Sequence, residues 1–137
     1  MIDTENTLLD RTREIFDCWS TLDWDRILAW FAEDASFQSM MREPTCGRDN
    51  IRELFTHAMQ DVTRVKLHLR NLVASGNVVI AERVDEFEIA GRTGRLPVVG
   101  VLEFRDGRIA AWRDYYDREI LIREMGLETD YAAPGIQ

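Results

Sequence analysis

The chain has 137 residues, 45% of them hydrophobic, and a formal net charge of -8 at neutral pH. This length predicts one globular domain over residues 1–137, large enough to enclose a cavity for a small ligand. The acidic charge argues against partners such as nucleic acid or an anionic membrane surface, because both require a basic footprint.

The two cysteines and the start of the chain bear on metal sites, disulfides and cellular location. Cys18 and Cys46 lack CxxC spacing, so the sequence indicates neither a zinc cluster nor a disulfide framework. No apolar stretch approaches the length of a membrane span, and no secretion signal follows Met1. We therefore expect a cytoplasmic protein without a metal site and without a membrane partner.

The first third of the chain predicts helices. Apolar residues recur with helical spacing from Leu8 to Trp19, and Asp23 can cap a short second helix that extends to Phe31. Residues 35–41 then predict a short strand. A third helix is indicated by the helical spacing of Ile51, Leu54, Phe55, Ala58 and Met59.

The remainder predicts a meander of four strands, at residues 64–74, 78–89, 96–105 and 108–116. The loops between them are short, so neighbouring strands should be antiparallel. Residues 117–125 indicate a terminal helix and residues 126–137 a C-terminal tail. The sequence thus predicts an α+β domain with its core over about residues 5–125.

Two acidic motifs occupy the later strands: Arg83-Val84-Asp85, and Trp112-Arg113-Asp114-Tyr115-Tyr116-Asp117. Alternation in the first motif places Arg83 and Asp85 on one face with apolar neighbours. Burying charges is costly unless they are paired, and buried carboxylates with altered ionisation are typical of working sites. A structural ion pair is the alternative interpretation.

The loop between the last two strands decides whether Asp114 faces the same side as Arg83. A two-residue loop would pair Phe104 with Ile109 and turn Asp114 outward. A three-residue loop over residues 105–107 would pair Phe104 with Arg108. We prefer the three-residue loop because it gathers the apolar residues on one face. That face then carries Val98, Leu102, Ala110, Trp112, Asp114 and Tyr116.

The element order and the two motifs resemble the limonene-1,2-epoxide hydrolase family over about residues 5–125. That family shares the cone-shaped α+β fold of nuclear transport factor 2, ketosteroid isomerase and SnoaL-like cyclases. The resemblance implies a curved mixed sheet with helices on its concave face enclosing a pocket. It also implies epoxide opening in one step without metal or cofactor. In that reaction Asp114 would deprotonate water, Asp85 would protonate the epoxide oxygen, and Arg83 would hold both carboxyl groups.

The first strand departs from this family pattern. The family positions its water with a Tyr and an Asn two residues apart, and the matching residues here are Phe37 and Ser39. A serine hydroxyl is shorter than an amide and makes fewer hydrogen bonds. Three outcomes remain: a slower hydrolase, a hydrolase with its water held elsewhere, or a cyclase whose substrate supplies the nucleophile.

The sequence therefore predicts a cofactor-independent epoxide hydrolase for a hydrophobic small molecule, forming a homodimer through the outer sheet face. The alternatives are an epoxide-opening cyclase or a ketosteroid-isomerase-like proton-transfer enzyme on the same fold, and a non-catalytic ligand-binding domain. The predicted catalytic residues are Asp85, Arg83 and Asp114. The residues predicted to contact substrate or water are Phe37, Ser39, Val98, Leu102, Trp112 and Tyr116.

Overall fold

The computed structural model describes residues 4–39 and 42–126. The predicted strand residues Met40 and Met41, and residues 127–137 of the predicted tail, lie outside the described residues. Along the chain the elements are α1 (Glu5–Trp19), α2 (Trp24–Leu28), β1 (Phe31–Ser39), β2 (Thr45–Cys46), α3 (Arg48–Ala58), β3 (Val62–Ser75), β4 (Val78–Ile89), β5 (Arg92–Arg105), β6 (Arg108–Tyr116) and α4 (Arg118–Met125).

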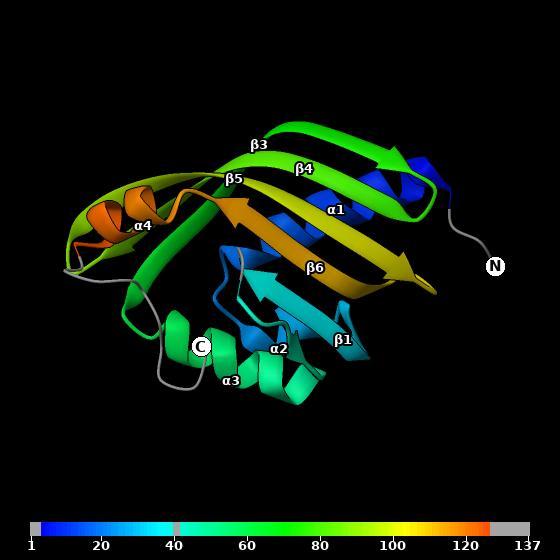
Figure 1. Ribbon diagram of the computed structural model, residues 1–137, viewed down its shortest axis with the longest axis horizontal. Coiled ribbons are helices and arrows are strands. Elements are labelled where there is room, and N and C mark those ends of the chain that lie inside the picture. Colours follow the sequence, from blue (N-terminus) through cyan, green and yellow to red (C-terminus); the bar gives the residue numbers. More distant parts are fainter. Residues whose placement is uncertain (1–3, 40–41, 127–137) are drawn as a thin grey trace.

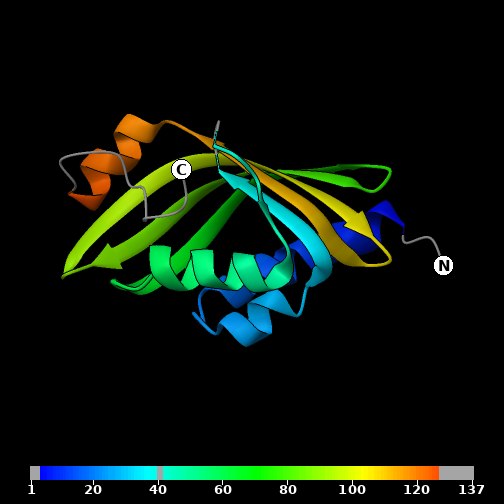
Figure 2. The ribbon, with the colours of Figure 1, turned by 60° about the horizontal axis from the view of Figure 1, so that its bottom comes forward.

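The six strands form one mixed sheet in the order β2-β1-β6-β5-β4-β3. β1 runs parallel to β6, and every other neighbouring pair is antiparallel. The sheet is strongly curved; α1, α2 and α3 lie on its concave side, and α4 lies at one end (Figures 1 and 2). The predicted α+β fold with helices on the concave face is confirmed.

The helices follow from capping and from amphipathic patterning. Thr4, Asp23 and Asp117 each accept a hydrogen bond from a backbone N–H in the first turn of α1, α2 and α4, as N-cap residues do. The apolar faces of the helices turn toward the sheet. On α1 the buried residues are Leu8, Thr12, Ile15, Phe16 and Trp19. None of the helices within the described residues is long and apolar enough to span a membrane.

The first strand begins earlier than predicted. Helix α2 ends at Leu28, and Phe31 is the first residue of β1 rather than the end of the helical stripe. The backbone N–H of Ile109 donates to the carbonyl of Trp30, and Phe31 pairs with Ile109 on β6. Pairing with a strand far along the sequence therefore overrides the local helical pattern here.

The predicted register of the last hairpin is wrong at its turn. Asp106 and Gly107 form a two-residue loop with φ values of 52° and 78°, and Arg105 pairs with Arg108. Phe104 therefore does not pair with Arg108. An Asp-Gly pair with both φ angles positive is the loop whose twist best matches two antiparallel strands.

A β-bulge after this turn brings Asp114 to the face of the sheet that was predicted for it. The register of β5 and β6 shifts by one residue between Phe104 and Glu103, and Ala110 is left without a partner. Ile109 and Trp112 are consequently both buried although they are three residues apart. Asp114 then faces the concave side with Trp112, so the predicted orientation of Asp114 is right while the loop that produces it is different.

Candidate active site

Arg83 on β4 joins the carboxyl group of Asp85, on the same strand, to that of Asp114 on β6. Its Nε and Nη2 donate to the two carboxyl oxygens of Asp85, at 2.7 and 3.1 Å. Its Nη1 and Nη2 donate to the two oxygens of Asp114, at 3.0 and 2.8 Å. The guanidinium is only 2% exposed. The structure thus brings the three predicted catalytic residues together, with the cation held between two acids by bidentate contacts.

The surroundings of Arg83 and Asp85 shift the pKa values of both groups. Burial lowers the pKa of Arg83, but the charges and hydrogen bonds of Asp114 and Asp85 raise it well above its ordinary value. Burial raises the pKa of Asp85, and this outweighs the opposing attraction of Arg83. Two close carboxylates resist double ionisation, so one proton is readily held by the pair. Asp85 is the acid on which burial favours that proton.

Asp114 has a second donor that the sequence did not reveal. The indole Nε1 of Trp112 donates to Oδ1 of Asp114 at 2.7 Å. Three N–H groups therefore converge on this carboxylate, whereas Asp85 receives two from Arg83. Trp112 was predicted as pocket lining, but its indole also fixes the carboxylate.

Aromatic rings cover the guanidinium. The Cζ atom of Arg83 lies 5.2 Å from the ring centroid of Phe16 on α1 and 5.8 Å from that of Trp112. Cations at such distances are attracted to the ring faces, and the rings also exclude water from the ion pairs. Phe16 was predicted only as part of the helical stripe, and no local sequence signal links it to Arg83.

Gly100 leaves the space that the charged network occupies. It lies on β5 opposite Asp114 of β6 and opposite Ala81 of β4. A Cβ at Gly100 would lie 2.6 Å from Nη1 of Arg83 and 2.8 Å from Oδ1 of Asp114. Glycine inside a strand often marks such a close approach. The sequence has this glycine inside a predicted strand, but only the strand register shows that it lies opposite Asp114.

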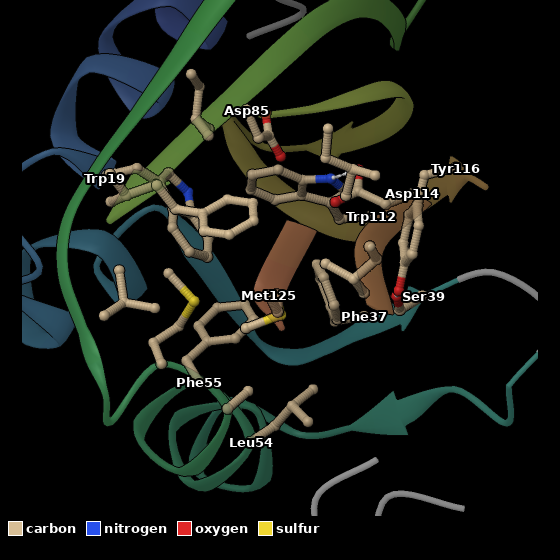
Figure 3. A pocket seen from close by; sticks show the side chains of 18 of the residues that line it. Trp19, Phe37, Ser39, Leu54, Phe55, Asp85, Trp112, Asp114, Tyr116 and Met125 are labelled. Atoms are coloured by element: carbon tan, nitrogen blue, oxygen red, sulfur yellow. Dashed lines mark hydrogen bonds between the residues drawn. The ribbon is translucent and has the colours of Figure 1, made fainter. Parts of the chain in front are cut away.

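The charged network lies at one side of an apolar cavity of about 170 Å³. Figure 3 shows the aromatic and aliphatic side chains that surround it, with Trp19 and Phe55 across from Asp114 and Tyr116. The walls come from α1, α3, α4 and the concave sheet face. The lining includes Trp19, Phe37, Ser39, Leu54, Phe55, Met59, Val62, Val65, Leu67, Arg83, Asp85, Phe87, Leu96, Trp112, Asp114, Tyr116, Leu121 and Met125.

The cavity contains most of the predicted contact residues. Phe37, Ser39, Trp112 and Tyr116 line it. Val98 and Leu102 face the same side of the sheet but are 3% and 0% exposed in the core, and the residues lining the cavity do not include them. Within residues 4–39 and 42–126, no group of three or more His, Cys, Asp or Glu side chains is arranged to hold a metal ion.

A hydroxyl pair stands at the edge of the network. Ser39 Oγ and Tyr116 Oη are 2.5 Å apart and hydrogen-bonded. Phe37, two residues before Ser39, packs edge-on against Phe55, with ring centroids 5.0 Å apart. The first strand thus presents an aromatic ring and a hydroxyl to the cavity, where the resemblance implied a phenol and an amide.

Comparison with known proteins supports the family assignment. The model of the SnoaL-like domain matches residues 12–112. The epoxide hydrolase EphG of Mycobacterium tuberculosis is 30% identical over 95 residues, which make up 69% of this chain and 63% of that protein. The match therefore spans less than two thirds of the relative's length.

Solved structures show the same fold. An LEH-like epoxide hydrolase from M. tuberculosis superposes with a TM-score of 0.76 and 23% identity, covering 89% of this chain and 94% of that one. A putative SnoaL-like polyketide cyclase from Jannaschia sp. CCS1 gives a TM-score of 0.79 at 13% identity, covering 91% and 95%. Proteins described as a hydrolase and as a cyclase thus share this architecture. The chain belongs to the SnoaL-like family of the nuclear transport factor 2-like fold, and it is similar to the epoxide hydrolases named above.

Proposed function

We propose that the protein hydrolyses an epoxide on a hydrophobic small molecule by direct addition of water. The observation that carries this proposal is the bidentate contact of Arg83 with both Asp85 and Asp114 at the side of an apolar cavity. Epoxide opening needs a base at the nucleophile and an acid at the leaving oxygen. Two carboxyl groups that share one proton supply both.

In the proposed step Asp114 takes a proton from water while the water oxygen forms a bond to one epoxide carbon. The bond between that carbon and the epoxide oxygen breaks, and its electron pair moves to the oxygen. Asp85 gives its proton to this oxygen, so the product is a diol. The step leaves Asp114 protonated and Asp85 ionised, and Arg83 contacts both carboxyl groups in either arrangement. Proton return to Asp85 completes the cycle without any covalent intermediate.

The cavity favours a small apolar substrate. Its volume of about 170 Å³ is close to the ~150 Å³ of an apolar cavity that holds benzene. Epoxides with a single six-membered ring, such as cyclohexene oxide and styrene oxide, match this size. The aromatic and aliphatic walls supply contact area for a hydrocarbon ring.

A cyclase that opens an epoxide with a hydroxyl group of its own substrate is the second candidate. It is favoured by Phe37, which provides no phenol to hold a water at the position where the hydrolases carry one. The acid and base roles of Asp85 and Asp114 would be unchanged. The product would be a cyclic ether rather than a diol.

A screen of terpene, styrene and cyclohexene epoxides tests the proposal. We expect diol formation by the wild-type protein and its loss in Asp85→Asn. Glu82→Gln, on the outer face of the same strand, is the matched control and should retain activity. Formation of cyclic ethers from hydroxy-epoxides without diols would favour the cyclase. Binding of epoxides without any turnover would favour a ligand-binding domain and contradict both enzymes.

We also propose a homodimer formed through the outer face of the sheet. Four large apolar side chains are exposed there, namely Val73, Ile80, Val99 and Tyr115. The register places them on adjacent rows of β3 to β6. Exposed apolar patches of this kind mark interaction surfaces. Val99→Asp should convert a dimer to a monomer in sedimentation, and a wild-type monomer would contradict the proposal.

A further inference from the structure

The Ser39–Tyr116 pair occupies the part of the site that departs from the family pattern. Ser39 on β1 and Asp114 on β6 are direct partners in the parallel pairing, and Tyr116 lies two residues beyond Asp114 on the same strand. All three residues line the cavity. Figure 3 shows the phenol of Tyr116 meeting the Ser39 hydroxyl beside Phe37, on the side of the pocket that carries Asp114. Position 37 has no phenol, but Tyr116 on β6 brings one to this part of the cavity.

Asp114 has an acceptor site left for a water. Its Oδ1 accepts from Arg83 Nη1 and Trp112 Nε1. Within the described residues, Oδ2 accepts only from Arg83 Nη2. An ionised carboxyl group offers about four acceptor sites, two on each oxygen. The second site on Oδ2 is thus available to take a hydrogen from the reacting water.

Tyr116 is chemically suited to hold that water. Burial raises the pKa of its phenol, and the charge of Asp114 adds to this, although Ser39, Arg118 and Arg42 act in the opposite direction. The phenol therefore keeps its hydrogen at neutral pH. One hydrogen of the two hydroxyl groups lies in the bond between them. A hydroxyl oxygen has two lone pairs, so the pair can accept a hydrogen bond from a water.

We propose that the Ser39–Tyr116 pair orients the nucleophilic water for Asp114. The water gives one hydrogen to Oδ2 of Asp114 and donates the other in a hydrogen bond to an oxygen of the hydroxyl pair. A lone pair of the water is then directed at the epoxide carbon, where the new C–O bond forms. This inference rests on the proposed hydrolase function, and it makes Tyr116 a positioning residue of that reaction.

The test compares Tyr116→Phe with Tyr115→Phe on an epoxide that the wild-type protein converts to a diol. Each variant loses one phenol oxygen and keeps its ring. Tyr116→Phe should lower kcat by about tenfold or more with little change in KM, because an oriented hydrogen bond to the reacting water is lost. Tyr115 lies on the outer face and is not among the residues that line the cavity, so Tyr115→Phe, which keeps the ring at the proposed dimer surface, should retain the wild-type kcat.

Rescue distinguishes water positioning from a structural role. In the Tyr116→Phe background, Phe37→Tyr returns a phenol to the cavity from β1 and should recover part of the lost kcat. Ser39→Ala should also lower kcat without raising KM. These results together would support the inference.

The inference fails if Tyr116→Phe retains the wild-type kcat. If the variant also has a lower melting temperature, the hydrogen bond serves only to join β1 to β6. A wild-type protein that forms no diol from any epoxide would overturn the hydrolase proposal and this inference with it. Failure of the inference alone is recognised by full hydrolase activity in the Tyr116→Phe variant.

Discussion

The floor and the side wall of the cavity differ in how closely they follow the epoxide hydrolase pattern. The floor, made of Arg83, Asp85 and Asp114 on β4 and β6, has the two carboxyl groups and the bridging cation that the pattern implies. The wall on β1 has Phe37 and Ser39 in place of a phenol and an amide. The difference separates two tasks of the proposed hydrolase: the floor would transfer protons in any epoxide opening, and the wall would decide which oxygen attacks.

The largest effect should come from breaking the floor. Asp114→Asn removes the base and should lower kcat by about 10² to 10⁴, the usual contribution of one positioned acid or base. Arg83 keeps its contacts with Asp85, so the protein should stay folded. Kinetics and thermal melting of the variant provide the check.

A purely structural network predicts a different pattern. In that case the variant that leaves Arg83 least paired, Asp85→Asn with Asp114→Asn, should lose about 3 to 5 kcal/mol of stability. Activity would be absent from the wild-type protein as well. Wild-type turnover that survives Asp114→Asn would contradict the role of the floor.

A smaller but still marked effect is expected at Gly100, which leaves the space that Arg83 and Asp114 of the floor occupy. Gly100→Ala would force Arg83 and Asp114 aside, because the added Cβ would lie within 2.6 and 2.8 Å of them. We expect destabilisation of about 1 to 3 kcal/mol and a loss of up to about 10² in kcat from misplaced groups. Denaturant unfolding and steady-state kinetics measure the two effects. Val101→Ala on the outer face of the same strand is the control, and equal effects in both variants would contradict a specific role for Gly100.

The ionisation of Asp85 gives the floor a directional pH dependence. Burial raises the pKa of Asp85. At a pH between the ordinary and the raised value, the folded state therefore holds a proton that the unfolded state has released. The free energy of unfolding should therefore fall as pH rises from the ordinary carboxyl value, about 4, through the raised value. The rate kcat should fall over the upper part of this range as the acid is lost.

The measurements are a pH profile of kcat and a pH series of thermal melts. Asp85→Asn should remove this part of the stability change. A stability that rises with pH through the same interval would show that the folded state does not retain this proton.

The smallest effect is expected from the wall. Phe37→Tyr with Ser39→Asn restores the donors of the hydrolase pattern on β1. If water is the nucleophile, diol formation should increase, but by less than about tenfold, because Tyr116 already supplies a phenol. If the substrate provides its own hydroxyl, the same changes should slow its cyclisation by holding a competing water. Product analysis of the double variant distinguishes the two nucleophiles, and unchanged kinetics would mean that these positions do not face the reacting oxygen.

The floor was the more predictable part because short-range patterns encode it. Strand alternation alone placed Arg83 with Asp85 on the buried face. The facing of Asp114 was predicted correctly from the clustering of apolar residues, although a bulge after a two-residue turn, not a three-residue loop, produces it. Burial of the apolar face constrains the facing more strongly than it constrains the turn.

Apart from the hydrogen bond of Trp112 with Asp114, the contacts that the sequence did not reveal join residues far apart along the chain. Phe16 covers the guanidinium of Arg83 from another element, and Gly100 leaves space for it from a neighbouring strand. The hydrogen bond between Ser39 and Tyr116 spans 77 residues and depends on the parallel pairing of β1 with β6. That pairing, which also moved the start of β1 to Phe31, has no local signal in the sequence.

The origin of the product oxygen tests the central claim most directly, because it shows whether Asp114 activates water or attacks the epoxide itself. A single turnover in heavy-oxygen water, with excess protein over epoxide, is followed by mass analysis of the diol and of the peptide that contains Asp114. Direct attack by water predicts label in the diol and none in the protein. Label in the carboxyl group of Asp114, with an unlabelled diol, would show a covalent route and contradict the assignment of Asp114 as the base.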